Sequence, residues 1–491
     1  MKRTPNIIFI VADDMGYGDF SAFNGGLSQT PHLDSMMAEG VTLTQHYSSS
    51  PVCFPARATL MTGKYPQRVG AVDLPHHRPF QYMSPHETTI GQLFQRAGYK
   101  TGLIGKWHLG DGELAPHHRG FDETACFCGG LMNYYRWTIN RNGVREKGDG
   151  RYLTDVWTEE AVSFIRRHRR EPFFLHLAYN APHTPLQAPE PDVKPFRETG
   201  KFNESVSTLY GMIRNMDAGV GRVLAEIGRL NLDEDTVVMF TSDNGPVMGK
   251  DLKRYNHSFR GGKGNVYEGG IRVPMIVKWP GRIDGGGRLS DVVHFADWFP
   301  TLLNLCEADI PDGIDHDGVD VMPMLKGCPV TPYPERCWQW SSYEPLPKYN
   351  AAIRAGDWKL LWPNFFSARP LKDFQLVDLV RFMNADELKG SGVVLPETGE
   401  YRNLEEYFVC LKRESAKPLS DRTRFTRVKP PELYNIGNDP EETNNVADQY
   451  PEIARRLETA LDHWFERNRP AWERCRAHDP YGLKPSAEAT P

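Results

Sequence analysis

The chain has 491 residues, which is enough for two or three domains, each with its own hydrophobic core. Its composition is typical of a globular protein, with 40% hydrophobic and 25% charged residues. The net charge of −5 is small for this length, so we expect neither nucleic acid nor an anionic membrane surface as a partner.

No apolar stretch approaches the ~20 residues needed to span a bilayer, so we expect no membrane-spanning segment. The apolar run from Ile7 to Ala12 is too short for the core of a signal peptide, and Asp13-Asp14 interrupts it. A cytoplasmic location is therefore expected, or a periplasmic or secreted one if a signal peptide has been removed. Eight cysteines are too sparse for a disulfide framework, and we expect buried or free thiols, Cys126 and Cys128 included.

Apolar runs alternate with helical patterns through the first 300 residues. The nearly continuous apolar run Asn6–Ala12 is typical of a strand that is buried on both faces. Similar runs predict strands at 103–104, 172–178, 236–241 and 273–278. Helices are expected at 31–37 after the start signal Thr30-Pro31, at 55–61, at 87–97 and at 209–230. This alternation predicts an α/β domain with a largely parallel central sheet and helices on both faces.

The pattern changes after about residue 335. Short apolar runs at 337–340, 351–354 and 358–362 predict a small antiparallel sheet, and residues 452–467 have the apolar spacing of a helix. We therefore expect a first domain over residues 1–335 and a smaller α+β domain over residues 336–477. Within the second domain, residues 363–430 are predicted to form an irregular, charged insertion, and residues 478–491 a flexible tail. The tryptophans of the small sheet are expected in its core rather than on a sugar-binding surface: Trp338, Trp340, Trp358 and Trp362.

Acidic pairs stand at the ends of two predicted strands. Asp13-Asp14 follows the first strand, before Gly16, and Asp243-Asn244 follows the strand at 236–241, before Gly245. The glycines allow each strand to break, so that both members of a pair can converge at the sheet edge where α/β proteins bind ligands. Three carboxylates and an amide oxygen suit Ca²⁺ or Mg²⁺. Each pair alone could simply make turns and cap helices, but two such pairs in one chain favour a metal site.

Cys53 lies two residues before Pro55, a residue that favours the first position of a helix. A group at that place lies at the positive end of the helix dipole, among free backbone N–H donors. Arg57 follows one turn later on the same side. A free cysteine more often packs in a core than acts as a nucleophile, so Cys53 alone does not indicate an activity.

The segments around these residues resemble the type I, formylglycine-dependent sulfatases. Cys53-Phe-Pro55-Ala-Arg57, continued by residues 58–63, is similar to the first signature of that family, and residues 98–110, with Lys106 and His108, are similar to the second. The remaining site segments of the family are matched in order, and its C-terminal segment by residues 433–447: Val11–Asp19, Ala181-Pro-His183, Ser242–Gly245 and Gly261-Gly-Lys263-Gly. The resemblance implies an alkaline phosphatase-like fold, in which a large mixed, mostly parallel sheet lies between helices.

The resemblance also implies a sulfuric ester hydrolase whose nucleophile is a formylglycine, made from Cys53 by a maturation enzyme. Hydrated, this aldehyde offers one hydroxyl to attack sulfur and a second whose deprotonation releases sulfate. Arg57 and Lys106 would hold the hydrated aldehyde, and His108 would accept a proton during release. The leaving oxygen would be protonated by His183 and Lys263. The residues that would bind one divalent cation, Ca²⁺ or less commonly Mg²⁺, are Asp13, Asp14, Asp243, Asn244 and the modified Cys53.

The expected substrate is a sulfate monoester of an aryl, sugar or other alcohol carrier. Two alternatives stay open: a phosphonate or phosphate ester hydrolase on the same scaffold, and an inactive protein that binds a sulfated glycan. A two-metal phosphatase is disfavoured, because the sequence offers no second Asp/His cluster. Several polar and aromatic residues near the motifs are expected to be ordinary surface loop residues: His76-His77, His117-His118-Arg119 and Arg136-Trp137.

Overall fold

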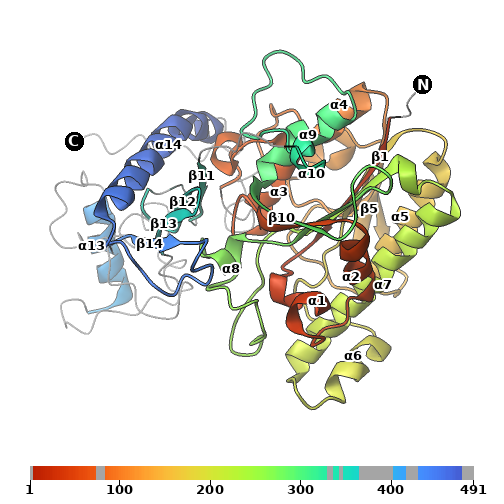
Figure 1. Cartoon of the computed structure of the whole chain (residues 1–491), viewed down its shortest axis with the longest axis horizontal. Helices are drawn as coiled ribbons and strands as arrows, with labels where there is room; N and C mark the ends of the chain where they lie inside the picture. Colours follow the sequence, from red (N-terminus) through yellow and green to blue (C-terminus); the bar gives the residue numbers. More distant parts are fainter. Residues whose placement is uncertain are drawn as a thin grey trace.

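The fold is built around one large sheet and one small sheet. The computed structural model describes residues 4–72, 83–328, 335–341, 345, 347–363, 402–415 and 430–477. Figure 1 shows helices on both sides of the large sheet, and the elements drawn in blue, α13, α14 and β14, gathered at one end of the molecule. The predicted α/β architecture with an added small antiparallel sheet is therefore confirmed.

Within the described residues, the large sheet has ten strands in the order β10-β2-β9-β8-β1-β7-β3-β4-β5-β6. The four pairings β8-β1, β1-β7, β7-β3 and β3-β4 are parallel, whereas β9 is antiparallel to both β2 and β8. The strands have these bounds: β1 (Asn6–Ala12), β2 (Val41–Tyr47), β3 (Lys100–Lys106), β4 (Glu123–Phe127), β5 (Thr138–Arg141), β6 (Val144–Lys147), β7 (Phe173–Ala178), β8 (Thr236–Ser242), β9 (Met275–Lys278) and β10 (Gly287–His294).

β1 occupies the middle of the sheet because it supplies an apolar side chain to both faces. Successive strand residues point to opposite sides. Ile7 and Phe9 pack into the core formed with helices α3, α4 and α9, while Ile8 and Ile10 pack into the core formed with α2, α5 and α7. The helices have these bounds: α1 (Ser21–Asn24), α2 (Pro31–Glu39), α3 (Cys53–Thr62), α4 (Ile90–Arg96), α5 (Leu153–His168), α6 (Glu190–Arg197), α7 (Glu204–Arg229), α8 (Glu268–Ile271), α9 (Trp298–Leu305), α10 (Met322–Leu325), α13 (Leu404–Ser415) and α14 (Pro451–Ala477).

The small sheet has four antiparallel strands and is covered by α14. The strands are β11 (Arg336–Gln339), β12 (Ala351–Ala355), β13 (Trp358–Trp362) and β14 (Glu432–Asn435). Leu457 and Leu461 of α14 pack against Ile353 and Leu360 of the sheet, as the helical spacing predicts. Trp338 and Trp362 are buried as expected, whereas Trp340 and Trp358 keep part of their surface exposed.

Several predicted boundaries differ from the observed ones. α3 begins at Cys53, so Pro55 is its third residue rather than its first. Proline is tolerated there because no N–H in the first turn has an intrahelical partner. α4 begins three residues later than expected, where Thr89 accepts a hydrogen bond from the backbone N–H of Gln92. α7 begins five residues earlier, capped by the side chain of Asn203.

Two further expectations are corrected. The stretch 363–430 is not irregular throughout, since it contains α13; most of it, like the expected tail 478–491 and His76-His77, lies outside the described residues. Arg119 and Trp137 are buried, not surface loop residues. The guanidinium of Arg119 donates to the backbone carbonyls of Pro85 and Glu87, and Trp137 packs into the core against α5.

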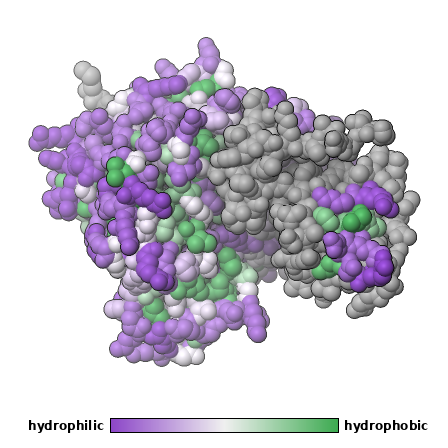
Figure 2. Space-filling view, turned by 180° about the vertical axis from the view of Figure 1, so that it is seen from behind, coloured by the Kyte–Doolittle hydropathy of each residue, from purple (hydrophilic) through white to green (hydrophobic). Residues whose placement is uncertain are grey.

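Hydrophilic residues cover most of the described surface in the view of Figure 2, and hydrophobic residues form only small patches there. Within the described part of the chain, no helix has both the length and the hydrophobicity that crossing a membrane requires. The same residues contain no disulfide bond, and Cys126 is buried.

Candidate active site

The two acidic pairs meet at one edge of the large sheet. β1 and β8 are parallel neighbours, with Ala12 opposite Ser242, so the residues that follow them emerge side by side. The backbone N–H of Asp14 donates to Asp243 Oδ1 at 3.3 Å, and Asn244 Nδ2 donates to Asp14 Oδ1 at 2.7 Å. All four side chains are buried. Parallel pairing therefore brings residues that are more than 200 positions apart in the sequence into one cluster of oxygen ligands.

The turn after β1 is made by Asp14 itself. Its φ of 66° is in the left-handed region, which non-glycine residues seldom adopt. Gly16 does not make this break, contrary to expectation: a Cβ on Gly16 would lie only 2.6 Å from a ring carbon of Pro246. Gly245 likewise allows a close approach, to the carbonyl oxygen of Gly269. Both glycines thus let neighbouring loops pack closely around the acidic pairs.

Cys53 faces these carboxylates from the first residue of α3. Its side chain is 2% exposed. Ligand atoms of Asp13, Cys53 and Asp243 all lie within 4.8 Å of one another. Arg57, one turn further along α3, donates through Nε to Asp243 Oδ2 at 2.8 Å and through a terminal nitrogen to the carbonyl of Lys106 at 3.0 Å. The helix therefore brings both a sulfur atom and a fixed positive charge to the acidic cluster.

Lys106 and His108 reach the cluster from the end of β3. Lys106 Nζ lies 2.5 Å from Asp13 Oδ2, and both groups are fully buried. His108 has a φ of 60°, so the chain is not extended here as the sequence suggested. Trp107 nevertheless points away, into the core, and donates from Nε1 to the carbonyl of Leu114 at 2.9 Å. The ring of His108 lies near Phe54, the second residue of α3, with centroids 5.8 Å apart.

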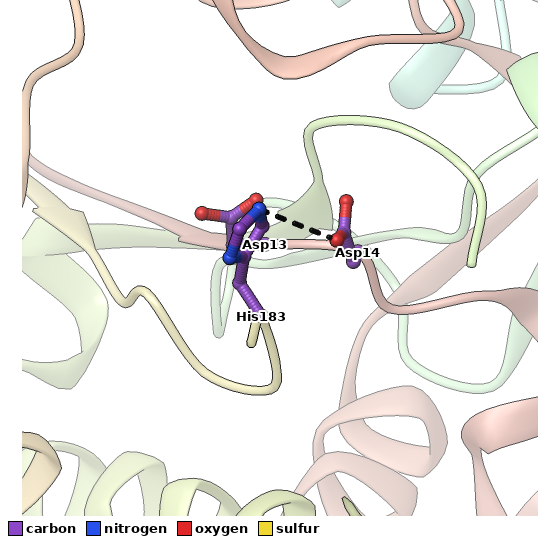
Figure 3. Close-up of side chains that lie close together, drawn as sticks. All are labelled: Asp13, Asp14 and His183. Carbon is purple, nitrogen blue, oxygen red and sulfur yellow. Dashed lines mark ion pairs between the residues drawn. The ribbon is translucent and has the colours of Figure 1, made fainter. Parts of the chain in front are cut away.

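His183 and Lys263 complete the cluster on its open side. His183 Nε2 lies 3.7 Å from Asp14 Oδ2, and Figure 3 shows its ring beside the carboxylates of Asp13 and Asp14. Lys263 Nζ lies 2.6 Å from Asp14 Oδ1. The side chains of His183 and Lys263 are 14% and 16% exposed, whereas the eight other predicted site residues are buried. A substrate would therefore reach the cluster past His183 and Lys263.

Burial and charge together set the protonation of the cluster. Burial alone would raise the pKa of Asp13, but Lys106, His183 and Arg57 hold it well below its usual range. Burial, reinforced by the charge of Asp13, raises the pKa of Asp243 to about 6. Burial and the nearby Lys106 and Arg57 lower the pKa of His108 far below its ordinary value, so this imidazole is neutral.

The oxygen atoms of the cluster suit a hard divalent cation. Asp13 Oδ1 and Asn244 Oδ1 are both buried and have no hydrogen-bond partner among the described residues. Such atoms are costly to bury unless something binds them. The carboxylates of Asp13, Asp14 and Asp243 balance the charges of Arg57, Lys106 and Lys263, so a bound divalent cation would leave the site net positive. A positive site of this kind favours an anionic substrate.

One residue pair that supports the site was not predicted. Asp19 Oδ2 accepts a hydrogen bond from the backbone N–H of Gly16 at 2.9 Å, and Arg254 binds both oxygens of Asp19 at 2.6 and 3.0 Å. The pair fixes the turn that follows Asp14. The two partners are 235 residues apart, and no local pattern in the sequence indicates that they meet.

Similarity to solved structures defines the class of protein. Ps i-CgsB in complex with k-i-k-neocarrahexaose is 29% identical, has a TM-score of 0.75, and is matched over 94% of this chain and 93% of that chain. The PsFucS1 sulfatase from Pseudoalteromonas sp. has the same fold, with a TM-score of 0.71 at 24% identity over 96% and 91% of the two chains. The fold is that of the alkaline phosphatase-like hydrolases.

Sequence similarity defines the family. A family model described as Sulfatase matches residues 5–308, and one described as N-sulphoglucosamine sulphohydrolase, C-terminal, matches residues 258–382. The steryl-sulfatase of Mus musculus is 31% identical over 74% of this chain and 71% of its own length. The N-acetylgalactosamine-6-sulfatase of Canis lupus familiaris is 33% identical over 68% of each chain. The chain belongs to the sulfatase family and is a sulfuric ester hydrolase.

Proposed function

We propose that this sulfatase hydrolyses its substrate with a formylglycine made from Cys53. One observation supports the proposal above the others: Cys53 is buried at the N-terminus of α3, with Asp13 and Asp243 on one side and Arg57 one turn behind. Burial raises the pKa of the Cys53 thiol, with Lys106 and Lys263 opposing that rise. A thiol so held is protonated and a poor nucleophile, so an unmodified cysteine does not account for the site.

The cation of the proposed site would be held by Asp13, Asp14, Asp243 and Asn244, with Ca²⁺ the expected ion. Its chemistry would be to withdraw charge from the nucleophilic oxygen and from the sulfate oxygens. Asp13 Oδ1 and Asn244 Oδ1, which lack hydrogen-bond partners among the described residues, support this assignment. Arg57 would keep Asp243 ionised and oriented, because its guanidinium binds Oδ2 of that carboxylate, whereas the N–H of Asp14 binds Oδ1.

The side chains around the nucleophile would divide the proton transfers between them. The hydrated aldehyde would supply one hydroxyl that attacks sulfur after losing its proton to solvent, and a second whose deprotonation releases sulfate and restores the aldehyde. Lys263 or His183 would give a proton to the ester oxygen as its bond to sulfur breaks, and His108 would accept the proton of the second hydroxyl. His108 suits this role, since its Nδ1 is buried and has no hydrogen-bond partner within the described part of the chain. Lys263 and His183 suit theirs, since both line the exposed side of the site.

The proposed substrate is a sulfate monoester of a carbohydrate. Two similarities support this proposal: the structure of Ps i-CgsB in complex with k-i-k-neocarrahexaose, and the N-acetylgalactosamine-6-sulfatase of Canis lupus familiaris. A steroid sulfate is the second candidate. A phosphonate monoester is a third, because the phosphonate monoester hydrolase SpPMH shares the fold with a TM-score of 0.61 at 19% identity.

Mass spectrometry of the peptide that contains residue 53 tests the nucleophile. In a host that has the maturation enzyme, we expect the aldehyde mass in the wild type and an unmodified peptide in C53A, with turnover of nitrophenyl sulfate only in the wild type. An unmodified thiol together with normal turnover would refute the formylglycine mechanism. An unmodified thiol, no turnover and tight binding of a sulfated glycan would indicate a binding protein instead.

Parallel kinetics test the substrate class. The value of kcat/KM for nitrophenyl sulfate should exceed that for the matching phosphonate ester, and a reversed order would overturn the sulfatase assignment of this site. A panel of sulfated sugars and a steroid sulfate then compares the carriers. Higher kcat/KM for the steroid sulfate than for every sugar would refute the carbohydrate proposal.

A further inference from the structure

A buried asparagine of the small sheet region binds the loop that carries Lys263. Asn350 immediately precedes β12 and is fully buried. Its Nδ2 donates to the carbonyl of Gly264 at 2.9 Å and to the carbonyl of Trp340 at 2.9 Å, and its Oδ1 accepts from the backbone N–H of Val266 at 3.1 Å. The side chain of Asn350 therefore uses both amide protons and its carbonyl oxygen in hydrogen bonds. Two of these three hydrogen bonds are made to the loop 263–266.

The same loop is attached to the active site by its backbone. The N–H of Lys263 donates to the carbonyl of Pro246 at 2.9 Å, and the N–H of Gly264 donates to the carbonyl of Pro51 at 2.8 Å. Pro51 lies two residues before Cys53, and Pro246 lies two residues after Asn244. The loop is thus bound by the nucleophile segment and a metal-ligand segment on one side, and by Asn350 on the other.

The backbone conformation of Asn350 restricts which residues can stand there. Its φ of 43° is in the left-handed region, where glycine is unstrained and asparagine is tolerated. Glycine would fit the backbone better but would offer no hydrogen bond to the loop. A residue that meets both demands must accept positive φ and carry two donors and an acceptor, and asparagine does so.

We propose that Asn350 is a positioning residue for Lys263: it fixes the backbone of residues 263–266 so that the Lys263 ammonium stays at the leaving oxygen. The inference rests on the proposed function, in which Lys263 protonates that oxygen. It also gives the C-terminal region a part in the reaction, since Asn350 lies beyond residues 5–308 of the Sulfatase match and within residues 258–382 of the C-terminal family match.

The leaving group of the substrate reveals this role. Nitrophenolate leaves readily without a proton, whereas the alcohol of a sugar sulfate needs one as its bond to sulfur breaks. In N350G the backbone strain is removed but the three hydrogen bonds are lost. We expect kcat for a sugar sulfate to fall on the order of 100-fold, the scale of a 1 Å misplacement, while kcat for nitrophenyl sulfate changes only a few-fold. A general loss of folded structure would lower both rates alike.

Two controls isolate the effect. N231G makes the same substitution at another positive φ, 55°, at an exposed position just beyond α7, and should leave both rates unchanged. K263A alone should also lower the sugar sulfate rate more than the aryl sulfate rate. Adding N350G to K263A should then cause little further loss, because two residues that act through one proton transfer are not additive.

The outcomes separate this inference from the proposed function. Suppose that the wild type turns over both esters. Equal rate losses for the two esters in N350G, or additive losses in the double variant, would then refute the role of Asn350 but not the proposed function. No turnover of any sulfate ester by a wild type that contains the aldehyde would refute the proposed function and this inference with it. If N350G does not fold, N350D replaces it: it keeps the acceptor for the Val266 N–H, loses both donors, and should show the same dependence on the leaving group.

Discussion

The buried pair of Arg254 and Asp19 provides a quantitative test of the electrostatics beneath the active site. Both side chains are 1% exposed. Arg254 binds the two carboxylate oxygens at 2.6 and 3.0 Å and donates to the carbonyl of Val247 at 2.8 Å. The substitution R254M keeps most of the side-chain volume and removes the charge, which leaves Asp19 with the N–H of Gly16 as its remaining partner among these contacts.

The expected loss depends on pH. Breaking a buried ion pair costs about 3–5 kcal/mol when the partner stays charged. The carboxyl group can escape that cost by binding a proton, and an aspartate with the ordinary pKa of about 3.9 binds one at a cost of about 1.4 kcal/mol per pH unit. The free-energy cost of protonating such a carboxylate is therefore about 4 kcal/mol at pH 7 and about 1.5 kcal/mol at pH 5, and the unpaired charge can cost no more than this. We therefore expect R254M to be about 4 kcal/mol less stable than the wild type at pH 7, and the part of this loss that comes from the unpaired charge to fall to about 1.5 kcal/mol at pH 5.

Urea unfolding followed by tryptophan fluorescence measures both differences. R197M is the matched control, since Arg197 binds both oxygens of Glu204 at 3.0 and 2.7 Å with the same fork, but on the surface. Its effect should be small and should not depend on pH in this way, because water screens and solvates both partners. A loss in R254M that is equal at pH 5 and pH 7, or no larger than that of R197M, would refute the reasoning.

Three other predictions concern pH, metal and packing. Burial, with the charge of Glu268 nearby, raises the pKa of Glu442 to about 7 from 4.5, so the stability from this group is full below about pH 4.5 and is lost as the pH rises through 7. The unfolding free energy of the wild type should therefore fall from pH 5 to pH 8 relative to that of E442Q, and parallel urea curves at the two pH values would contradict this. Ca²⁺ at 100 times its Kd should stabilise the wild type by about 2.7 kcal/mol in thermal melts, whereas D13N should lose this shift. L457A should cost about 2–5 kcal/mol in urea unfolding, because Leu457 is fully buried between α14 and the small sheet; a loss below 1 kcal/mol would show that the helix is not held there.

The strands that could be predicted from the sequence are those whose apolar pattern matches their burial in the folded chain. β1 and β8 are buried at every position, and each has a continuous apolar run, residues 7–12 in β1 and 237–240 in β8, so their sequences identify them. β2 (Val41–Tyr47) was not predicted, since threonine, glutamine and histidine interrupt its apolar pattern. β14, with four residues, is too short to show a period. Its place is fixed by pairing with β13, which no local signal indicates.

Some features of the candidate site could likewise be predicted from the sequence and others could not. The positions of Asp13 and Asp243 directly after two strands predicted that they lie close together, because neighbouring parallel strands end at the same edge of the sheet. The same reasoning could not predict that Asp14 turns the chain, since left-handed backbone at an aspartate depends on the surrounding packing. Asn350 could not be predicted either. Its partners Gly264 and Val266 lie in a loop more than 80 residues away, and an asparagine before a strand is common in any turn.

The left-handed backbone conformation of Asp14 and His108, two residues of the candidate site, lowers the stability of the fold. Each residue costs about 1–2 kcal/mol relative to a relaxed conformation, and glycine at either position would recover most of that energy. D14G and H108G would relieve this backbone strain, but they would remove one carboxylate and one imidazole from the site. In the proposed function, the strain at these two turns is the cost of placing both groups beside Cys53. Stabilising substitutions in this enzyme are therefore best sought away from these two turns.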